Sequence, residues 1–83
     1  MYQVVIERQV QKQLSKISAP YYQAIIEALK ALASNPRPNG YIKLKSRPGY
    51  RIRVADYRII YNINDKILTV FILGIGHRKD IYE

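Results

Sequence analysis

The fold is decided by one stretch of the chain, YRIRVADYRIIY, at positions 50–61. Its β-branched and aromatic residues predict two short strands joined by a tight turn at the central Ala-Asp pair. Side chains of a strand alternate between its two faces, so Arg51 and Arg53 share one face while tyrosine and aliphatic side chains share the other. A two-residue loop would place Arg53 directly opposite Arg58. Because such like-charged pairs destabilise a hairpin, this face is predicted to bind a polyanion.

Strand-like segments continue on both sides of this hairpin, and short turns separate them. Connections this short leave no room for crossover helices, so four strands should form an antiparallel meander. The run 67–75 is apolar at both alternating positions, which suits a central strand, and Gly74 and Gly76 should let the chain leave that strand and bend. The four predicted strands are residues 41–45, 50–54, 57–62 and 67–73.

The first half of the chain predicts a strand and two helices. Residues 2–6 read as a first strand, and Val10, Leu14 and Ile17 recur at helical spacing. A longer helix should run over residues 20–33, with Ser18 as a possible cap, and end at the proline-rich segment 35–40. We therefore predict one α+β domain over residues 1–83. The strand and helical hairpin pack on one face of a mostly meander sheet, and the arginines occupy the opposite face.

The amino-acid composition restricts the classes of molecule that the chain can be expected to bind. The chain has 83 residues and a formal charge of +8, which favours nucleic acid or an acidic protein as partner. It has no cysteine, no evident signal peptide and no apolar run as long as a membrane span, which predicts a cytoplasmic protein without disulfides or thiolate metal sites. Positive charge is concentrated between positions 37 and 58, on Arg37, Lys43, Lys45, Arg47, Arg51, Arg53 and Arg58.

The carboxyl-terminal segment GIGHRKDIY, at positions 74–82, is the second group of candidate site residues. Histidine can act as an acid or a base near neutral pH, so His77 is a candidate for proton transfer, although a lone histidine near a terminus is more often an ordinary surface residue. Arg78 and Lys79 either bind phosphate or form a solvated tail. Tyr82 either stacks on a base or fills a hydrophobic gap under the helices.

Together these segments resemble the RelE/ParE superfamily of bacterial toxin–antitoxin toxins, and more specifically its RelE branch. The resemblance covers nearly the whole chain. Its parts are the strand and helical hairpin, the KLK segment at 43–45, the YRIR and DYRIIY strands, and the GHRKDIY tail. It implies a RelE-like α+β fold and an endoribonuclease that cleaves mRNA in the ribosomal decoding site, without a metal or other cofactor.

The resemblance also implies roles for individual residues. The ribose 2′-hydroxyl attacks the adjacent phosphate, and basic and aromatic side chains surround that phosphate; the matching positions are Arg51, Arg53, Arg58, His77, Arg78 and Tyr82. Flanking cations that would bind RNA are Lys43, Lys45, Arg47 and Lys79. RelE carries lysine where this chain has Arg51 and Arg53, and arginine is a poor proton acceptor, so His77, or less directly Lys45, would take that role.

Two other functions are compatible with the sequence. The ParE branch shares the fold but poisons DNA gyrase, and the basic-aromatic tail favours the nuclease branch over it. A non-catalytic nucleic-acid-binding module is the third reading. The family implies an antitoxin partner that neutralises the basic face or displaces the tail, with mRNA and the ribosome as further partners. DNA would be contacted only through the antitoxin complex, and no membrane is involved.

Overall fold

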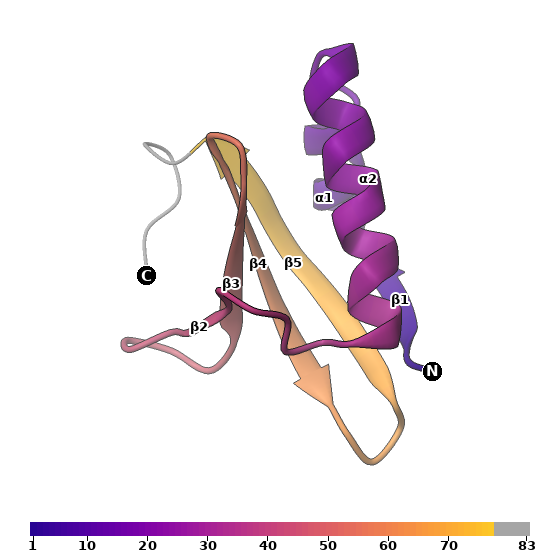
Figure 1. Ribbon diagram of the computed structural model, residues 1–83, viewed down its shortest axis with the longest axis vertical. Coiled ribbons are helices and arrows are strands. Elements are labelled where there is room, and N and C mark those ends of the chain that lie inside the picture. The colour runs from indigo at the N-terminus through magenta and orange to yellow at the C-terminus, as the bar shows by residue number, and fades with distance from the viewer. Residues whose placement is uncertain (78–83) are drawn as a thin grey trace.

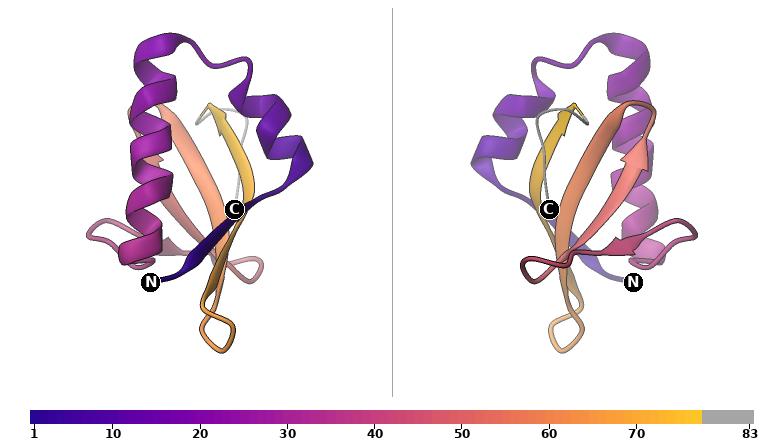
Figure 2. Two further views of the ribbon diagram at one scale, coloured as in Figure 1. Left: turned by 90° about the vertical axis from the view of Figure 1, so that its right-hand side faces the viewer. Right: turned by 90° about the vertical axis from the view of Figure 1, so that its left-hand side faces the viewer.

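A computed structural model describes residues 1–77, in which two helices cover one face of a single sheet (Figure 1). Figure 2 shows the helices in front of the sheet in one view and behind it in the opposite view. The predicted α+β arrangement is therefore confirmed. In chain order the elements are β1 (Gln3–Ile6), α1 (Arg8–Leu14), α2 (Ala19–Ser34), β2 (Ile42–Lys43), β3 (Tyr50–Val54), β4 (Tyr57–Asn64) and β5 (Thr69–His77).

The described strands form one sheet in the order β1-β5-β4-β3-β2. From β2 to β5 each strand pairs antiparallel with the next, as the meander prediction requires. β1 adds to the far side of β5 in parallel, and the two helices supply the long connection that precedes the meander. The sheet is therefore mixed, and β5 lies inside it, as its doubly apolar pattern predicted.

The predicted bounds of the last strand were wrong at both ends. Ile67 and Leu68 lie in the β4–β5 turn with 60% and 49% of their surfaces exposed, so β5 begins only at Thr69. The strand then continues through Gly74 and Gly76 instead of bending there. A β-bulge opposite Ile60 and Tyr61 shifts the register by one residue. Ile72 and Ile75 therefore both reach the helix-covered side, although a regular strand would place them on opposite faces.

β2 is shorter than the predicted strand 41–45 because the chain curls back toward β3. The Leu44 amide donates to the Gly49 carbonyl at 3.0 Å, which closes a loop between the two strands. Gly49 has φ +124° and lies so close to β4 that a Cβ there would stand 3.0 Å from the Tyr61 carbonyl oxygen. Only glycine fits this position without a local shift.

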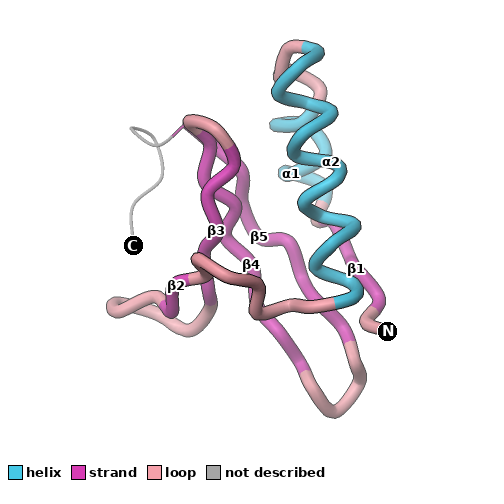
Figure 3. Tube along the Cα trace, viewed as in Figure 1, coloured by secondary structure: helices cyan, strands magenta, loops and turns pink. Residues whose placement is uncertain are grey.

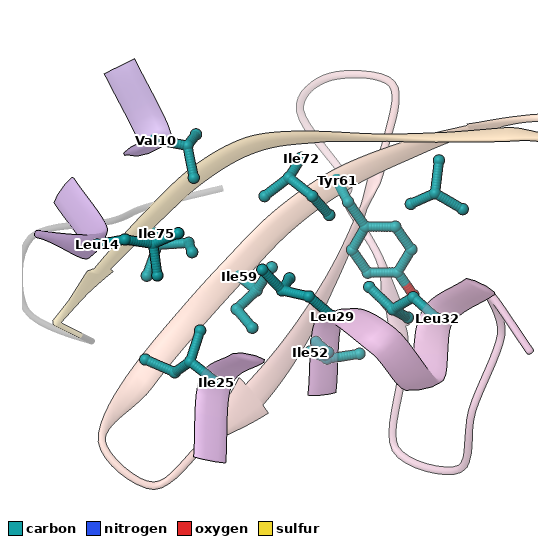
Figure 4. Packing of buried hydrophobic residues seen from close by; sticks show 11 residues of the cluster. Val10, Leu14, Ile25, Leu29, Leu32, Ile52, Ile59, Tyr61, Ile72 and Ile75 are labelled. Carbon is teal, nitrogen blue, oxygen red and sulfur yellow. The ribbon is translucent and has the colours of Figure 1, made fainter. Parts of the chain in front are cut away.

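The core fills the space between helices and sheet (Figure 4). α2 begins with a proline in its first turn, which the helix tolerates there, and Ser18 occupies the N-cap position without a side-chain capping bond. The predicted stripe of Ile25, Leu29 and Leu32 is buried against the sheet, while Ala28 is partly buried. Tyr61 is fully buried and donates its hydroxyl to the Pro36 carbonyl at 2.7 Å, which ties β4 to the end of α2. Burial raises the pKa of Tyr61 to about 12.

Candidate nucleic-acid interface

The β3–β4 hairpin has the register that the sequence predicted. Val54 pairs with Tyr57 across a two-residue turn, and Arg53 lies directly opposite Arg58. Ala55, the first turn residue, has φ +55°, a conformation that glycine adopts more easily. Because Ile52 and Ile59 are in the core, the arginines on the alternate positions project from the other side of the sheet. We call this surface, made by Arg51, Arg53 and Arg58, the arginine face.

The neighbouring strand leaves space beside these side chains. The β4–β5 register sets Arg58 opposite Gly76 and Ile60 opposite Gly74. One side of Arg58 therefore meets another arginine and the other side meets a residue without a side chain. Ile60, on the same side of the sheet as Arg58, is only 2% exposed and lies outside the main core cluster. The result is a basic surface with an apolar floor, bordered by a strand that carries glycines.

The arginine face is partly shielded from water. Arg53 is exposed, Arg51 and Arg58 are half-buried, and the Nε atom of Arg58 is buried. A cavity of about 320 Å³ lies beside Arg51 and Arg53 and is also lined by Gly40 and Ile42. Guanidinium groups can donate two parallel hydrogen bonds to one phosphate, and such bonds are stronger where water is limited. This geometry suits a phosphate contact.

The structure distributes the other predicted cations more widely. Lys43 pairs with Tyr50 across β2 and β3, so it lies on the opposite side of the sheet from Arg51. Lys45 and Arg47 are exposed in the loop between β2 and β3. Arg37 is not part of the arginine face, because it forms an ion pair with Asp65 at 3.0 Å. Arg37 and the hydroxyl of Tyr2 both donate to Asp65 and hold the pKa of that carboxyl below its usual value.

His77 is not brought to the arginine face. It pairs with Tyr57 at the end of β5, two positions after the core residue Ile75. The rings of His77 and Tyr57 meet edge to face at 5.8 Å, and Tyr57 also contacts Tyr21 of α2 with ring centroids 5.9 Å apart. These contacts place the imidazole on the helix side of the hairpin tip. Arg78, Lys79 and Tyr82 lie outside the described residues.

Within residues 1–77, no group of three His, Cys, Asp or Glu side chains is arranged to hold a metal ion. Neither described helix is long and apolar enough to cross a membrane.

Residues 4–82 match a family model described as the ParE toxin of the type II toxin–antitoxin system parDE. The chain belongs to the RelE/ParE superfamily of toxins. The toxin is 32% identical to RelE in the archaeal RelE–RelB complex from Pyrococcus horikoshii, with a TM-score of 0.85, over 96% of this chain and 98% of that one. No curated protein sequence matches the toxin.

Other solved structures agree on the fold. The toxin–antitoxin complex RelBE2 from Mycobacterium tuberculosis matches with 28% identity and a TM-score of 0.81, over 93% of the toxin and 98% of that chain. The isolated E. coli RelE toxin matches with 22% identity and a TM-score of 0.80, over 93% of the toxin and 84% of that chain, which supports the fold alone. The family model carries the ParE name and these structures carry the RelE name, and the two branches make up one superfamily.

The sequence did not single out three residues that border the arginine face in the structure, namely Ile60, Gly74 and Gly76. Its pattern indicated an ordinary strand residue at Ile60 and the end of a strand at the glycines. Their contribution depends on the β4–β5 register and its bulge. A repeated Gly-x-Gly inside a β-branched run was the available signal, since glycine within a strand often marks close approach of a ligand or backbone.

Proposed function

We propose that this toxin is an endoribonuclease that cleaves mRNA, in the decoding site of the ribosome and therefore in the cytoplasm. The observation that carries the proposal is the arginine face. Three guanidinium groups lie together on two strands, beside a strand that carries glycines at the neighbouring positions. An RNA backbone needs both features, because it brings negative charge and must approach the sheet closely.

The proposed reaction is transfer within the RNA backbone. The 2′-hydroxyl loses its proton and its oxygen attacks the adjacent phosphorus, while the bond from phosphorus to the 5′ oxygen breaks and that oxygen is protonated. The products are a cyclic phosphate and a free 5′-hydroxyl. Arg51, Arg53 and Arg58 would stabilise the extra negative charge on the phosphorane. Such electrostatic stabilisation by preorganised donors is usually the largest single contribution to catalysis.

Proton transfer needs a group other than the three arginines, because arginine does not release its proton in proteins. His77 could serve only by reaching around the hairpin tip, since its ring contacts Tyr57 on the helix side. Arg78 and Tyr82 remain proposed site residues on the strength of the family resemblance, with Arg78 on the phosphate and Tyr82 stacked on a base. Lys45, Arg47 and Lys79 are proposed to bind flanking phosphates, and Lys43 would do so from the other side of the sheet.

The toxin is proposed to have an antitoxin partner of the RelB type. Several structural relatives were solved as complexes of RelE with RelB, including those from P. horikoshii and E. coli. A chain of formal charge +8 with arginines grouped on one face is well suited to neutralisation by an acidic segment.

Translation of a defined mRNA, with mapping of the new 5′ ends, tests the nuclease proposal. We expect cuts spaced by codons that appear only when ribosomes are present. Cuts that also appear in free RNA would support a nuclease but overturn its dependence on the ribosome. Intact mRNA in both reactions would overturn the nuclease proposal.

A gyrase poison is the second candidate, because the matching family model is described as the ParE toxin. In that case mRNA stays intact while cleaved gyrase–DNA complexes accumulate. A third outcome is that the toxin binds RNA, arginine substitutions weaken this binding, and no cleavage is detected. That result would identify a non-catalytic binding module.

A further inference from the structure

The last part of β5 extends beyond the strand that covers its outer edge, the edge away from β4. β1 pairs with β5 only as far as Ile72, whereas β5 continues to His77 (Figure 3). This part of β5 contains Gly74 and Gly76, which pair with β4 beside the arginine face. Glycine has no side chain to pack and is a poor strand residue, so the glycines that leave space beside the arginines also weaken this part of β5.

Two glutamines of α1 bond to the edge that β1 does not reach. The Nε2 atom of Gln9 donates to the Leu73 carbonyl at 2.9 Å. The Oε1 atom of Gln13 accepts from the Ile75 amide at 2.9 Å. The backbone partners decide which atom of each side-chain amide is used, because a carbonyl oxygen can only accept and a backbone N–H can only donate. Gln9 therefore acts as a donor and Gln13 as an acceptor.

The packing of α1 brings both glutamines to the strand. Gln9 and Gln13 are four residues apart and therefore lie one turn apart on the same face of the helix. The residues that follow them, Val10 and Leu14, are buried in the core, and α1 contacts β5. Ile75 is buried in the same core. A packed helix therefore holds the two side-chain amides against the edge of β5.

We propose that Gln9 and Gln13 are positioning residues for RNA cleavage. They hold the part of β5 that contains the two glycines against β4, and so fix its position relative to Arg58. The chain also continues from this part of β5 to Arg78, another proposed site residue. A displacement of about 1 Å in a catalytic site can lower the rate about 10²-fold. The inference rests on the nuclease activity proposed above, although the hold on β5 can be measured without RNA.

Two double variants of identical composition and net charge test the proposal. The first is Gln9→Lys with Gln13→Glu. Its ammonium group can still donate to the Leu73 carbonyl, and its carboxylate can still accept from the Ile75 amide. The second is Gln9→Glu with Gln13→Lys, in which each position has lost the group that it needs. The second arrangement is the better one for the helix itself, because it places the acid near the N-terminus and the base near the C-terminus.

We expect the second variant to lower kcat for ribosome-dependent mRNA cleavage at least about tenfold, with KM nearly unchanged because the three arginines remain. The first variant should stay within about threefold of the wild-type kcat. In the unbound toxin, amide exchange followed by NMR should be faster at Ile75 and Gly76 in the second variant only. Unchanged exchange at Leu29 in α2 shows that a variant is folded.

A milder pair of single variants covers the case in which the second double variant does not fold. Gln9→Lys and Gln13→Lys add the same charge, but only Gln13→Lys removes the acceptor for the Ile75 amide. We therefore expect only Gln13→Lys to lower kcat and to speed amide exchange at Ile75 and Gly76.

Equal kcat in the two double variants, or a loss that appears only as a higher KM, would overturn the positioning role. Unchanged exchange at Gly76 in the second variant would do the same. If that variant sediments as a dimer, the glutamines keep a second copy from this edge and do not position the site. Absence of cleavage by the wild-type toxin contradicts the nuclease proposal, and exchange at Gly76 then decides whether the glutamines hold this part of β5.

Discussion

Arg58 occupies the middle of the arginine face. It lies opposite Arg53 on one side and opposite Gly76 on the other, and its Nε atom is buried. Because its neighbours already fix the position of the Arg58 guanidinium, the side chain needs little rearrangement when negative charge develops on a bound phosphate. Its position makes it the best single residue with which to test whether the face is catalytic.

We expect Arg58→Ala to lower the rate of ribosome-dependent mRNA cleavage by about 10²–10³, because one charge-stabilising donor is lost. Arg8→Ala, which removes an exposed arginine from α1 on the helix side, is the control and should leave the rate unchanged. His77→Ala should cost less than Arg58→Ala, since His77 contacts Tyr57 on the helix side. A larger loss for His77→Ala, with unchanged RNA affinity, would restore histidine as the proton-transfer residue.

Tyr61 couples stability to alkaline pH. The pKa of Tyr61 is raised to about 12 in the folded chain, mainly by burial, whereas an unfolded tyrosine titrates near 10. Below pH 10 both states keep the proton, so this stabilisation is fully present. Between about pH 10 and 12 only the unfolded state loses it, and the unfolding free energy should fall by about 1.4 kcal/mol per pH unit from this group.

Tyr61→Phe provides the comparison in urea unfolding curves measured across that pH range. The substitution should remove the contribution of Tyr61 to the slope and, near neutral pH, should cost about 1 kcal/mol because the Pro36 carbonyl loses its donor. Identical pH dependence in both proteins would show that the phenol does not titrate within the core.

At the scale of the elements, the loop between β2 and β3 packs closely against β4 at Gly49. Gly49→Ala combines positive φ with a Cβ 3.0 Å from the Tyr61 carbonyl oxygen, and it should destabilise the fold by about 2–3 kcal/mol. Gly40→Ala is the matched control, because φ there is +89° but no atom lies within 4 Å of the added Cβ. It should cost only about 1 kcal/mol in thermal or urea unfolding. Equal losses would mean that backbone strain, and not the contact with β4, decides both.

The same elements show what the sequence could predict. The hairpin was predictable because alternation and a short turn fix its register locally, and the stripe on α2 was predictable from helical spacing. The bulge in β5 and the parallel partner of β1 were not, since both depend on contacts between residues far apart in the chain. For the same reason the sequence identified the arginines but not the glycines beside them, and it could not assign His77 to a face.

At the scale of the whole molecule, we expect RNA binding to depend on where the positive charge lies as well as on its amount. Binding of a non-cleavable RNA should weaken with salt, and replacing Arg51, Arg53 and Arg58 by Gln should reduce the slope of log K against log salt by about 2. Replacing three exposed cations of the helix side, Arg8, Lys12 and Lys16, by Gln changes the net charge equally and should leave the slope nearly unchanged. Equal effects of the two triple variants, measured by fluorescence anisotropy, would mean that RNA responds only to overall charge.

The parallel pairing of β1 with β5 has a consequence for the order of events during synthesis. Gln3 pairs with Thr69, so β1 leaves the ribosome before β5 and has no partner in the sheet until β5 follows it. The β3–β4 hairpin can form earlier, but without β5 it lacks Val70, Ile72 and Ile75, a large share of the core beneath it. A nascent chain that has reached Arg58 but not β5 therefore carries its arginines without the surface that holds them. The toxin should become active only after β5 has been made, which leaves its antitoxin an interval in which to bind an unfinished sheet.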